Sequence, residues 1–291
     1  MDHAGAAKAA SPLTRALDPL HSAQYFAPET EQYLTAAGLR PGRMCYFASR
    51  SAAFGAIGPG GVAATFFNFN PALVARHIPR AWTLATAEQI LAARLEAVDA
   101  TLRRLLGDET LASPEVAEAA ELAREATEGC VPEGRPLYAA HADLDWPEQP
   151  HMVLYHAATL LREYRGDGHI AALVDHGLSG IGALITHTGM AKAFTPDAAK
   201  RTRGWSEEEW DAGVAVLVER GVVDASGVLT ESGTKLRAGI ESRTDDAGVG
   251  PWLRLGDDKV ERLHELGRAL SRAAVAAGAF PKALFATANK A

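Results

Sequence analysis

The chain contains only two cysteines, no long apolar run and no excess of positive charge, and each shortage excludes a class of protein. Cys45 and Cys130 lie far apart and fit no zinc-ligand spacing, so we expect two reduced thiols in a cytoplasmic protein. No stretch approaches the roughly eighteen uncharged apolar residues that a membrane-spanning helix needs, so we expect no membrane partner. The net charge of −7 gives no general attraction to nucleic acid or anionic lipid.

The composition is that of a globular protein with an apolar core, because 47% of the residues are hydrophobic and 22% are charged. A length of 291 residues is enough for two domains, or for one domain with a large accessory part. The first residues, Met1 to Ser11, are rich in alanine and lack the hydrophobic core of a signal peptide, so we expect a frayed tail. Ser11 followed by Pro12 then predicts the first helix start.

Helical periodicity predicts a mainly α fold, in which a helical N-terminal domain is joined to a degenerate winged-helix domain with one small β-hairpin. In the helix expected over Thr86 to Gly107, Arg94, Arg103 and Arg104 are assigned to the solvated face. The predicted parts are residues 11–134 as the helical domain, 135–180 as connecting helices with a polar stretch, 181–246 as the winged-helix-like domain and 250–291 as C-terminal helices that pack back. The apolar stripe expected to bury the last helix is Val260, Leu263, Leu266, Leu270 and Val275.

The most polar stretch of the connecting part is residues 160–170, which holds two arginines, two carboxylates, a tyrosine and a histidine. Gly166 and Gly168 interrupt it, so the backbone is expected to turn sharply or to approach another group closely. Apolar sequence on both sides favours the floor of a pocket. A structural turn held by an arginine–aspartate pair is the alternative.

The candidate site combines this stretch with a histidine–tyrosine pair near the N-terminus. A carboxylate commonly fixes an imidazole tautomer, so Asp167 is expected to orient His169 as a general acid/base, while an arginine holds a substrate oxygen. His21 and Tyr25 are four apart and would share a helix face. The candidate catalytic residues are His169, Asp167, Arg165 and His21. The candidate substrate-binding residues are Tyr25, Arg162, Tyr164, Phe66, Phe69, Trp146 and His156.

No metal and no cofactor are expected at this site. His151 and His156 are five apart, which does not place them on one helical face as a metal pair requires. The chain has no nucleotide-binding loop, no nucleophile elbow and no paired-cysteine motif, so phosphoryl transfer, serine hydrolysis and thiol redox chemistry have no support.

The C-terminal part has the signals of a helix-turn-helix module. Ser206 and Glu209 form a capping-box pattern, and Gly221 is placed to end that helix. Two short apolar runs around Asp-Ala-Ser-Gly predict a β-hairpin over Val222 to Thr230. The next helix is expected over Thr234 to Thr244.

These motifs carry a resemblance to known families. Residues 219–223 and 229–233 resemble a winged helix of the multiple-antibiotic-resistance-regulator type. Over nearly its whole length the chain also resembles an actinobacterial helix-turn-helix-like family of unassigned function, through residues 19–26, 48–52, 162–169, 203–206 and 241–245. The family pattern has a histidine where this chain has Tyr164. The resemblance implies the fold and implies no reaction.

The helix that would enter a DNA groove argues against specific nucleic-acid binding. Its start, Ser206 to Asp211, carries four carboxylates, whereas groove-reading helices need Arg, Lys, Asn or Gln there. Lys200, Arg201 and Arg203 are the only opposing signal. We therefore expect a small-molecule-binding protein, leaning towards an enzyme of specialised metabolism whose scaffold has lost DNA binding. The alternatives are a ligand-responsive transcription regulator and a non-catalytic binding protein, and a homodimer is one possible assembly.

Overall fold

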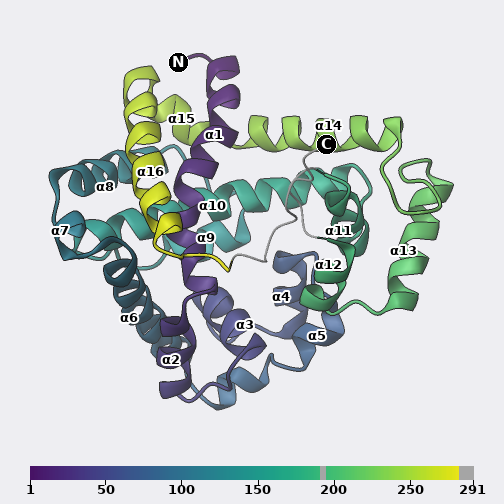
Figure 1. The fold of residues 1–291 in the computed structure, drawn as a ribbon, viewed down its shortest axis with the longest axis horizontal. Coiled ribbons are helices and arrows are strands. Elements are labelled where there is room, and N and C mark those ends of the chain that lie inside the picture. The colour runs from purple at the N-terminus through teal and green to yellow at the C-terminus, as the bar shows by residue number, and fades with distance from the viewer. Residues whose placement is uncertain (191–194, 282–291) are drawn as a thin grey trace. The chain divides into compact units, whose positions relative to one another are not determined.

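The computed structural model describes residues 1–190 and 195–281, and these form sixteen α-helices with three short 3-10 helices (Figure 1). No β-strand occurs within these two ranges, so the mainly α class is confirmed. No single described helix is long and apolar enough to cross a membrane, and α10 and α11 reach that criterion only when they are counted together.

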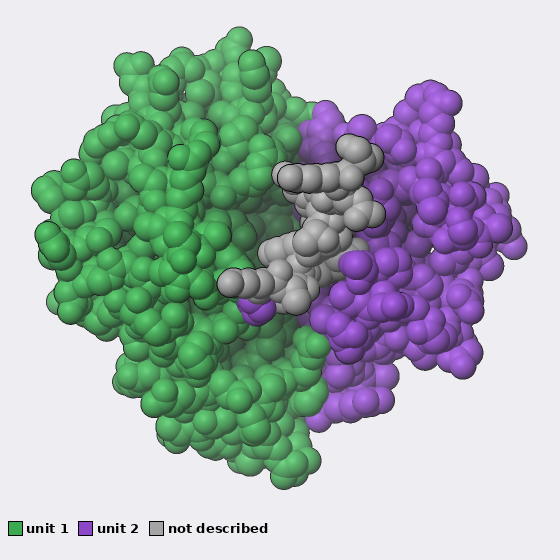
Figure 2. All heavy atoms as spheres, viewed as in Figure 1, with its two compact units in different colours: residues 1–57, 77–168, 245–280 green, residues 58–76, 169–244, 281–291 purple. Residues whose placement is uncertain are grey.

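The helices form two compact units, which Figure 2 colours separately. Unit 1 is assembled from three segments of the chain, Met1–Ile57, His77–Gly168 and Asp245–Phe280. Unit 2 contains Gly58–Arg76 and His169–Thr244. Neither unit is continuous in sequence.

Unit 1 contains most of the longer helices. Its α-helices are α1 (His3–Ser22), α2 (Pro28–Ala36), α3 (Arg43–Ser51), α6 (Ala87–Leu106), α7 (Asp108–Leu111), α8 (Pro114–Thr127), α9 (Pro136–Ala142), most of α10 (Pro150–Asp175), α15 (Gly250–Leu255) and α16 (Asp257–Ala276). Its 3-10 helices are η1 (Ala23–Tyr25), η2 (Ala52–Phe54) and η3 (Arg80–Thr83). Helix α6 begins at a complete capping box between Thr86 and Gln89 and ends at Gly107, whose φ of 78° suits glycine.

The first helix begins earlier than the sequence predicts. Helix α1 starts at His3, where the Asp2 side chain caps the N–H of Gly5, so the expected frayed tail over Met1 to Ser11 is wrong. Ala6 and Ala10 are fully buried in the core of unit 1. Small alanine side chains let α1 pack closely while favouring the helical backbone, which explains the difference.

The last described helix packs back as predicted. Helix α16 lies beside α1 in Figure 1 and also contacts α6 and α8. The buried members of the predicted stripe are Val260, Leu263, Leu266 and Leu270. Val275 is 50% exposed, so its assignment to the stripe is wrong. It lies in the last turn of α16, beside an open groove.

Helix α10 runs without a break through the polar stretch, so the predicted turn at Gly166 and Gly168 is wrong. The other expectation was that the backbone approaches another group closely, and this occurs at Gly168. A Cβ atom at this position would overlap Nη1 of Arg135, and that guanidinium donates to the carbonyl oxygens of Tyr164 and Ala247. The glycine is therefore a packing requirement of a continuous helix.

Unit 2 contains the segment in which the sequence predicts a helix-turn-helix module. The helices of unit 2 are α4 (Pro59–Phe66), α5 (Pro71–Ala75), α11 (Gly180–Thr188), α12 (Pro196–Arg203), α13 (Glu207–Glu219) and most of α14 (Glu231–Ala247). The capping box at Ser206 and Glu209 is formed as predicted. The predicted hairpin is reduced to a single antiparallel bridge between Val223 and Leu229. Asp224 explains this, because its Oδ1 accepts from the backbone N–H groups of Ser226 and Val228 and closes a tight turn.

Candidate functional site

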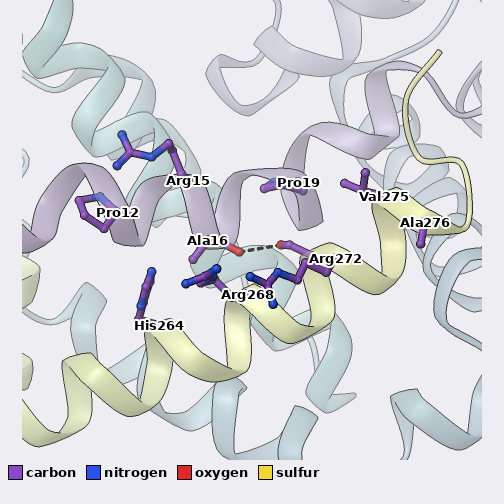
Figure 3. Close-up of a pocket in the computed structure, with 10 residues that line it drawn as sticks. Pro12, Arg15, Ala16, Pro19, His264, Arg268, Arg272, Val275 and Ala276 are labelled. Carbon is purple, nitrogen blue, oxygen red and sulfur yellow. Dashed lines mark hydrogen bonds between the residues drawn. The ribbon is translucent and has the colours of Figure 1, made fainter. Parts of the chain in front are cut away.

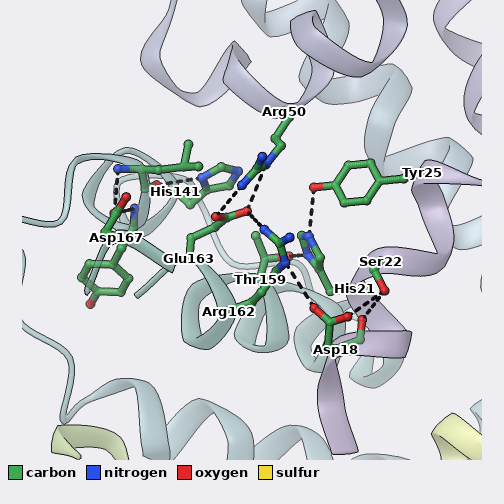
Figure 4. Close-up of polar contacts among 12 residues, drawn as sticks. Asp18, His21, Ser22, Tyr25, Arg50, His141, Thr159, Arg162, Glu163 and Asp167 are labelled. Atoms are coloured by element: carbon green, nitrogen blue, oxygen red, sulfur yellow. Dashed lines mark hydrogen bonds and ion pairs between the residues drawn. The ribbon is translucent and has the colours of Figure 1, made fainter. Parts of the chain in front are cut away.

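A buried polar network is the most unusual feature of unit 1, and Figure 4 shows its central part. Glu163 of α10, only 1% exposed, accepts from Arg50 of α3 (Nη2–Oε2 3.1 Å) and from its neighbour Arg162 (Nη1–Oε1 2.7 Å). Although burial raises the pKa of Glu163, the two guanidiniums outweigh burial and hold the pKa well below its usual value. Arg162 also pairs with Asp18 at 3.2 Å. The network thus fixes two partly buried cations around one buried, ionised carboxylate.

His21 of α1 forms the second part of the network, and its hydrogen bonds fix its tautomer. Thr159 donates its only hydroxyl hydrogen to the carbonyl of Tyr155 at 2.9 Å, so it accepts from His21 Nδ1, also at 2.9 Å. His21 Nε2 then accepts from the hydroxyl of Tyr25 at 2.9 Å. Burial, with the nearby Arg162, holds the pKa of His21 well below its usual value, and burial raises the pKa of Tyr25. The resting pair is a neutral imidazole and a neutral phenol.

Arg94 of α6 forms the third part of the network. Its Nε donates to Tyr155 Oη at 2.8 Å and to Gln24 Oε1 at 3.1 Å. Its Nη1 donates to the carbonyl of Ser49 and to His141 Nε2, both at 3.1 Å. Burial lowers the pKa of His141 to about 3, which keeps that imidazole neutral and able to accept. Arg94 is 4% exposed, so its assignment to the solvated face is wrong.

The first cavity beside this network has a volume of about 450 Å³, and we call it the tyrosine cavity. Its wall includes Tyr25, Tyr46, Thr30 and Arg43. The rings of the two tyrosines lie 5.2 Å apart between centroids. The buried hydroxyl of Thr30 has no hydrogen-bond partner, and Arg43 makes no ion pair with any described residue. The cavity therefore presents polar groups whose bonding capacity is unused.

A second cavity of about 160 Å³ lies on the Arg94 side of the network, and we call it the leucine cavity. Its apolar wall consists of Leu91, Leu95, Leu144 and Pro147. Its polar wall consists of Arg94, His141, Tyr155, His156 and Thr159, with Asp145 exposed at its side. Thr159 therefore lines this cavity and also bonds His21, and the Tyr155 ring stacks on His21.

The predicted catalytic residues of the polar stretch do not act as one group. Asp167 accepts from the backbone N–H groups of Leu137 (3.0 Å) and Tyr138 (2.9 Å), so it caps the start of α9. His169 is bonded through Nδ1 to Thr244 Oγ1 at 2.8 Å. On a continuous helix, residues two apart point about 200° away from each other, so Asp167 is not placed to orient His169.

Arg165, the third predicted catalytic residue of the stretch, pairs with an acid outside the stretch. Its Nη2 lies 3.0 Å from Asp245 Oδ1. If the stretch were only a structural turn, Arg165 was expected to pair with a carboxylate of the stretch itself. Arg165 and Asp245 both belong to unit 1, whereas His169 belongs to unit 2.

The remaining predicted residues fall into separate places. The structure brings together His21, Tyr25 and Arg162 in the network of unit 1. Tyr164 packs beneath the Arg135 guanidinium, 4.1 Å from the ring centroid. Trp146 packs edge-to-face on His156 with centroids 4.7 Å apart, and Phe66 packs on Phe69 at 6.4 Å in unit 2. Only His156 among these last residues lines a described cavity of the network.

Sequence analysis missed Arg50, Arg94, Thr159 and Glu163 as members of the site. A signal existed for Arg50, because it is the one charged residue of an otherwise small and apolar motif that carries the family resemblance. Thr159 had no such signal, because a single threonine in an apolar helix normally bonds its own backbone. Glu163 lies in the polar stretch that the sequence singles out. One of its partners, Arg50, is 113 positions away, so no local pattern could show the pair.

Another groove of unit 1 lies elsewhere, between α1 and α16 (Figure 3). It has a volume of about 650 Å³ and a basic rim of Arg15, His264, Arg268 and Arg272. Its cations are surface groups, and the Ser271 hydroxyl on its floor donates to a backbone carbonyl of α1 at 2.6 Å. The groove is separate from the buried network in its residues.

Thiol and metal chemistry find no support in the geometry. Burial raises the pKa of Cys45 to about 11 and that of Cys130 to about 12, so both remain neutral thiols. Among residues 1–190 and 195–281, no group of three His, Cys, Asp or Glu side chains is arranged to hold a metal ion.

The comparison with protein families gives one match. A profile of a helix-turn-helix family covers residues 10–281, which is nearly the whole chain. The chain belongs to this helix-turn-helix family. Comparisons with curated proteins and with solved structures give no significant match. The family match assigns no ligand and no reaction.

Proposed function

We propose that the protein binds a small molecule in the tyrosine cavity of unit 1 and acts on it by acid–base chemistry. The observation that carries the proposal is the Tyr25–His21 pair. Tyr25 lines the 450 Å³ cavity, and its hydroxyl donates to the buried neutral imidazole of His21. Enzyme sites combine concave pockets with a few convergent polar groups whose pKa values are strongly shifted.

The chemistry of the pair is a proton relay. A proton that leaves the substrate passes to the Tyr25 oxygen as the tyrosine's own proton passes to His21 Nε2. The reverse transfer returns a proton to the substrate. Burial and the nearby Arg162 disfavour the imidazolium that forms, and the ionised Glu163 offsets part of this because its charge raises the pKa of His21. Arg43, which has no ion-pair partner among the described residues, is available to a carbonyl or anionic oxygen of the substrate.

Unit 2 supports this proposal because the electrostatics of its helix-turn-helix region oppose DNA binding. We propose that α11 to α14 are a reduced winged helix that has lost its DNA face. Lys200 pairs with Glu207 of α13 at 2.5 Å and with Asp197 at 3.3 Å. Arg203 donates to Asn68 Oδ1 at 3.2 Å and stacks over a phenylalanine ring. Two of the three basic side chains that precede α13 are therefore engaged within unit 2.

The test is to incubate the full chain with a small-molecule extract of its source cells and to follow compounds by mass spectrometry. We expect at least one compound to be consumed by the wild type. Tyr25→Phe removes only the hydroxyl and should reduce turnover by about 10²–10⁴-fold with little change in Tm. Tyr33→Phe makes the same chemical change outside the cavity and should behave as the wild type.

Two results would change the conclusion. A compound that is bound by the wild type and never consumed would identify a non-catalytic binding protein. Equal turnover by Tyr25→Phe and the wild type would overturn the acid–base role. A ligand-responsive regulator is the second candidate, favoured by the helix-turn-helix family match, and it predicts tight binding to a DNA segment.

A further inference from the structure

The leucine cavity contains hydrogen-bonding groups that the protein itself leaves unused. Arg94 is buried, yet no described carboxylate lies within ion-pair distance of it, and its Nη2 makes no hydrogen bond with any described residue. An isolated buried cation is costly unless a counter-charge is supplied. All hydrogen bonds of this cation go to neutral acceptors, and Glu163, whose charge raises the pKa of Arg94, lies beyond ion-pair distance.

Two neighbours of Arg94 in the same cavity are also incompletely bonded. The Tyr155 hydroxyl accepts from Arg94 Nε, and no described acceptor lies within reach of its own hydrogen. Neither nitrogen of His156 has a hydrogen-bond partner within the described part of the chain, although His156 is only 5% exposed. Burial lowers the pKa of His156 to about 4, so its imidazole is neutral. The cavity thus offers one fixed cation and two polar neighbours.

The remaining wall sets the size and polarity of the ligand. Leu91, Leu95, Leu144 and Pro147 are apolar, and the cavity volume is about 160 Å³. A dry cavity of about 150 Å³ holds a molecule of the size of benzene. The only acid at the wall, Asp145, is exposed and makes no ion pair in the described residues.

We propose that the leucine cavity binds a small monocarboxylic acid with an apolar body about the size of a benzene ring. The carboxylate lies against Arg94 and accepts from Nη2 and from the Tyr155 hydroxyl, while the body fills the space between the leucines. Because Nε and Nη1 already donate within the protein, the selectivity comes from the positive charge of Arg94, which favours a carboxylate over a neutral amide of the same shape. This site is a different cavity from the one at Tyr25, although Thr159 lines it and also bonds His21 of the proton relay.

The test is calorimetric titration of the full chain with benzoate, isovalerate and benzamide. We expect at least one of the two acids to bind with a dissociation constant on the order of 1 mM or tighter. Benzamide, the neutral isostere of benzoate, should bind at least about tenfold more weakly. Failure of both acids to bind, or equal affinity for benzoate and benzamide, would overturn the proposal.

Variants locate the site. Leu144→Trp fills the cavity from a half-buried position and should abolish acid binding, whereas Leu253→Trp, on an exposed part of α15, should leave it unchanged. Arg94→Lys keeps the charge without the planar fork and should weaken acid binding about tenfold. If Arg94→Lys does not fold, Leu144→Trp still decides the outcome.

A further variant separates this site from the tyrosine cavity. Thr30→Trp blocks the tyrosine cavity and should leave acid binding intact. Acid binding that survives Leu144→Trp and disappears in Thr30→Trp would place the acid at the substrate site and overturn this inference, while leaving the proposed function standing.

Discussion

At the scale of single residues, Asp167 shows how a polar motif can mislead. Sequence analysis paired it with His169, and the structure gives its carboxylate to two backbone amides at the start of α9. His141, which accepts from Arg94, lies on that same short helix. Asp167 therefore positions a wall of the site without being part of its chemistry.

The titration of Asp167 gives a testable pH dependence. Burial raises its pKa from the ordinary 3.8 to about 6, so the folded protein holds this proton more tightly than the unfolded chain does. Its contribution to stability is therefore complete below pH 3.8 and is lost as the pH rises to about 6. In urea unfolding, the stability of Asp167→Asn relative to the wild type should increase across this window and then level off. A difference that is constant from pH 4 to pH 7 would contradict the assignment.

Gly166 and Gly168 provide a matched pair of substitutions in one helix. Alanine normally stabilises a helix interior by up to about 1 kcal/mol relative to glycine, and a Cβ at Gly166 meets Glu163 only at 3.5 Å, an ordinary contact. A Cβ at Gly168 overlaps Arg135 instead, so Gly168→Ala should lower the free energy of unfolding by about 1–3 kcal/mol. Chemical denaturation measures both. In an Arg135→Ala background the overlap is absent, so Gly168→Ala should lower the free energy of unfolding by less.

Part of the candidate site could be predicted from individual residues. The i, i+4 spacing of His21 and Tyr25 predicted that they share a helix face, and the structure adds the hydrogen bond between them. Arg50 and Arg94 reach the network from other helices, and no local pattern shows which arginine of an amphipathic helix is buried. Sequence pattern favours the solvated face for arginine, and tertiary structure overrode it at Arg94.

At the scale of elements, α1 is the clearest departure from expectation. Its first turns were expected to fray, yet Ala6 and Ala10 are fully buried against the core. Alanine gives a weak hydrophobic signal in sequence because its side chain is small, and only close helix packing makes it a core residue.

The burial of α1 predicts the effect of placing a charge on it. Ala10→Glu would bury an unpaired carboxylate and should lower the free energy of unfolding by about 3 kcal/mol or more. Ala4→Glu places the same side chain on the exposed face of the same helix and should change stability by about 0.5 kcal/mol at most. Thermal unfolding of the two variants compares them directly. Equal Tm values would mean that α1 does not pack on the core.

The elements that were predicted best are those with strong local signals. Helices α6 and α13 have complete capping boxes, and α16 has a buried apolar stripe from Val260 to Leu270. The predicted hairpin is shorter than expected: two backbone bonds, Asp224 N–H to the Val228 carbonyl and Thr230 N–H to the Val222 carbonyl, flank its single bridge, and the Asp224 side chain bonds the turn. A short apolar run flanked by turn residues does not show whether its backbone N–H groups bond across a hairpin or to a nearby side chain.

At the scale of the whole molecule, charge predicts poor DNA binding. The chain carries a net charge of −7, and the first turn of α13 holds three glutamates at positions 207–209. Binding to duplex DNA should be weaker than about 10⁻⁶ M at physiological salt and should disappear as salt is raised. Fluorescence anisotropy with random and upstream duplexes measures this. Nanomolar affinity for an upstream duplex would favour the regulator.

The division into units lies beyond sequence patterns. Each unit is assembled from separated segments, and α10 supplies residues to both of them. Periodicity identifies the face that a helix buries and carries no information on the partner, so the sequence predicts helices more securely than their assembly.

The pairing of the first and last described helices has a consequence for biosynthesis. Gly267 of α16 packs against Leu17 of α1, and about 250 positions separate them in the chain. At a synthesis rate of about 5–20 residues per second, roughly ten to fifty seconds pass before the partner of α1 leaves the ribosome. The apolar face of α1 is available to other chains during that interval. A nascent chain stalled before α16 should therefore recruit chaperones that the finished protein no longer needs.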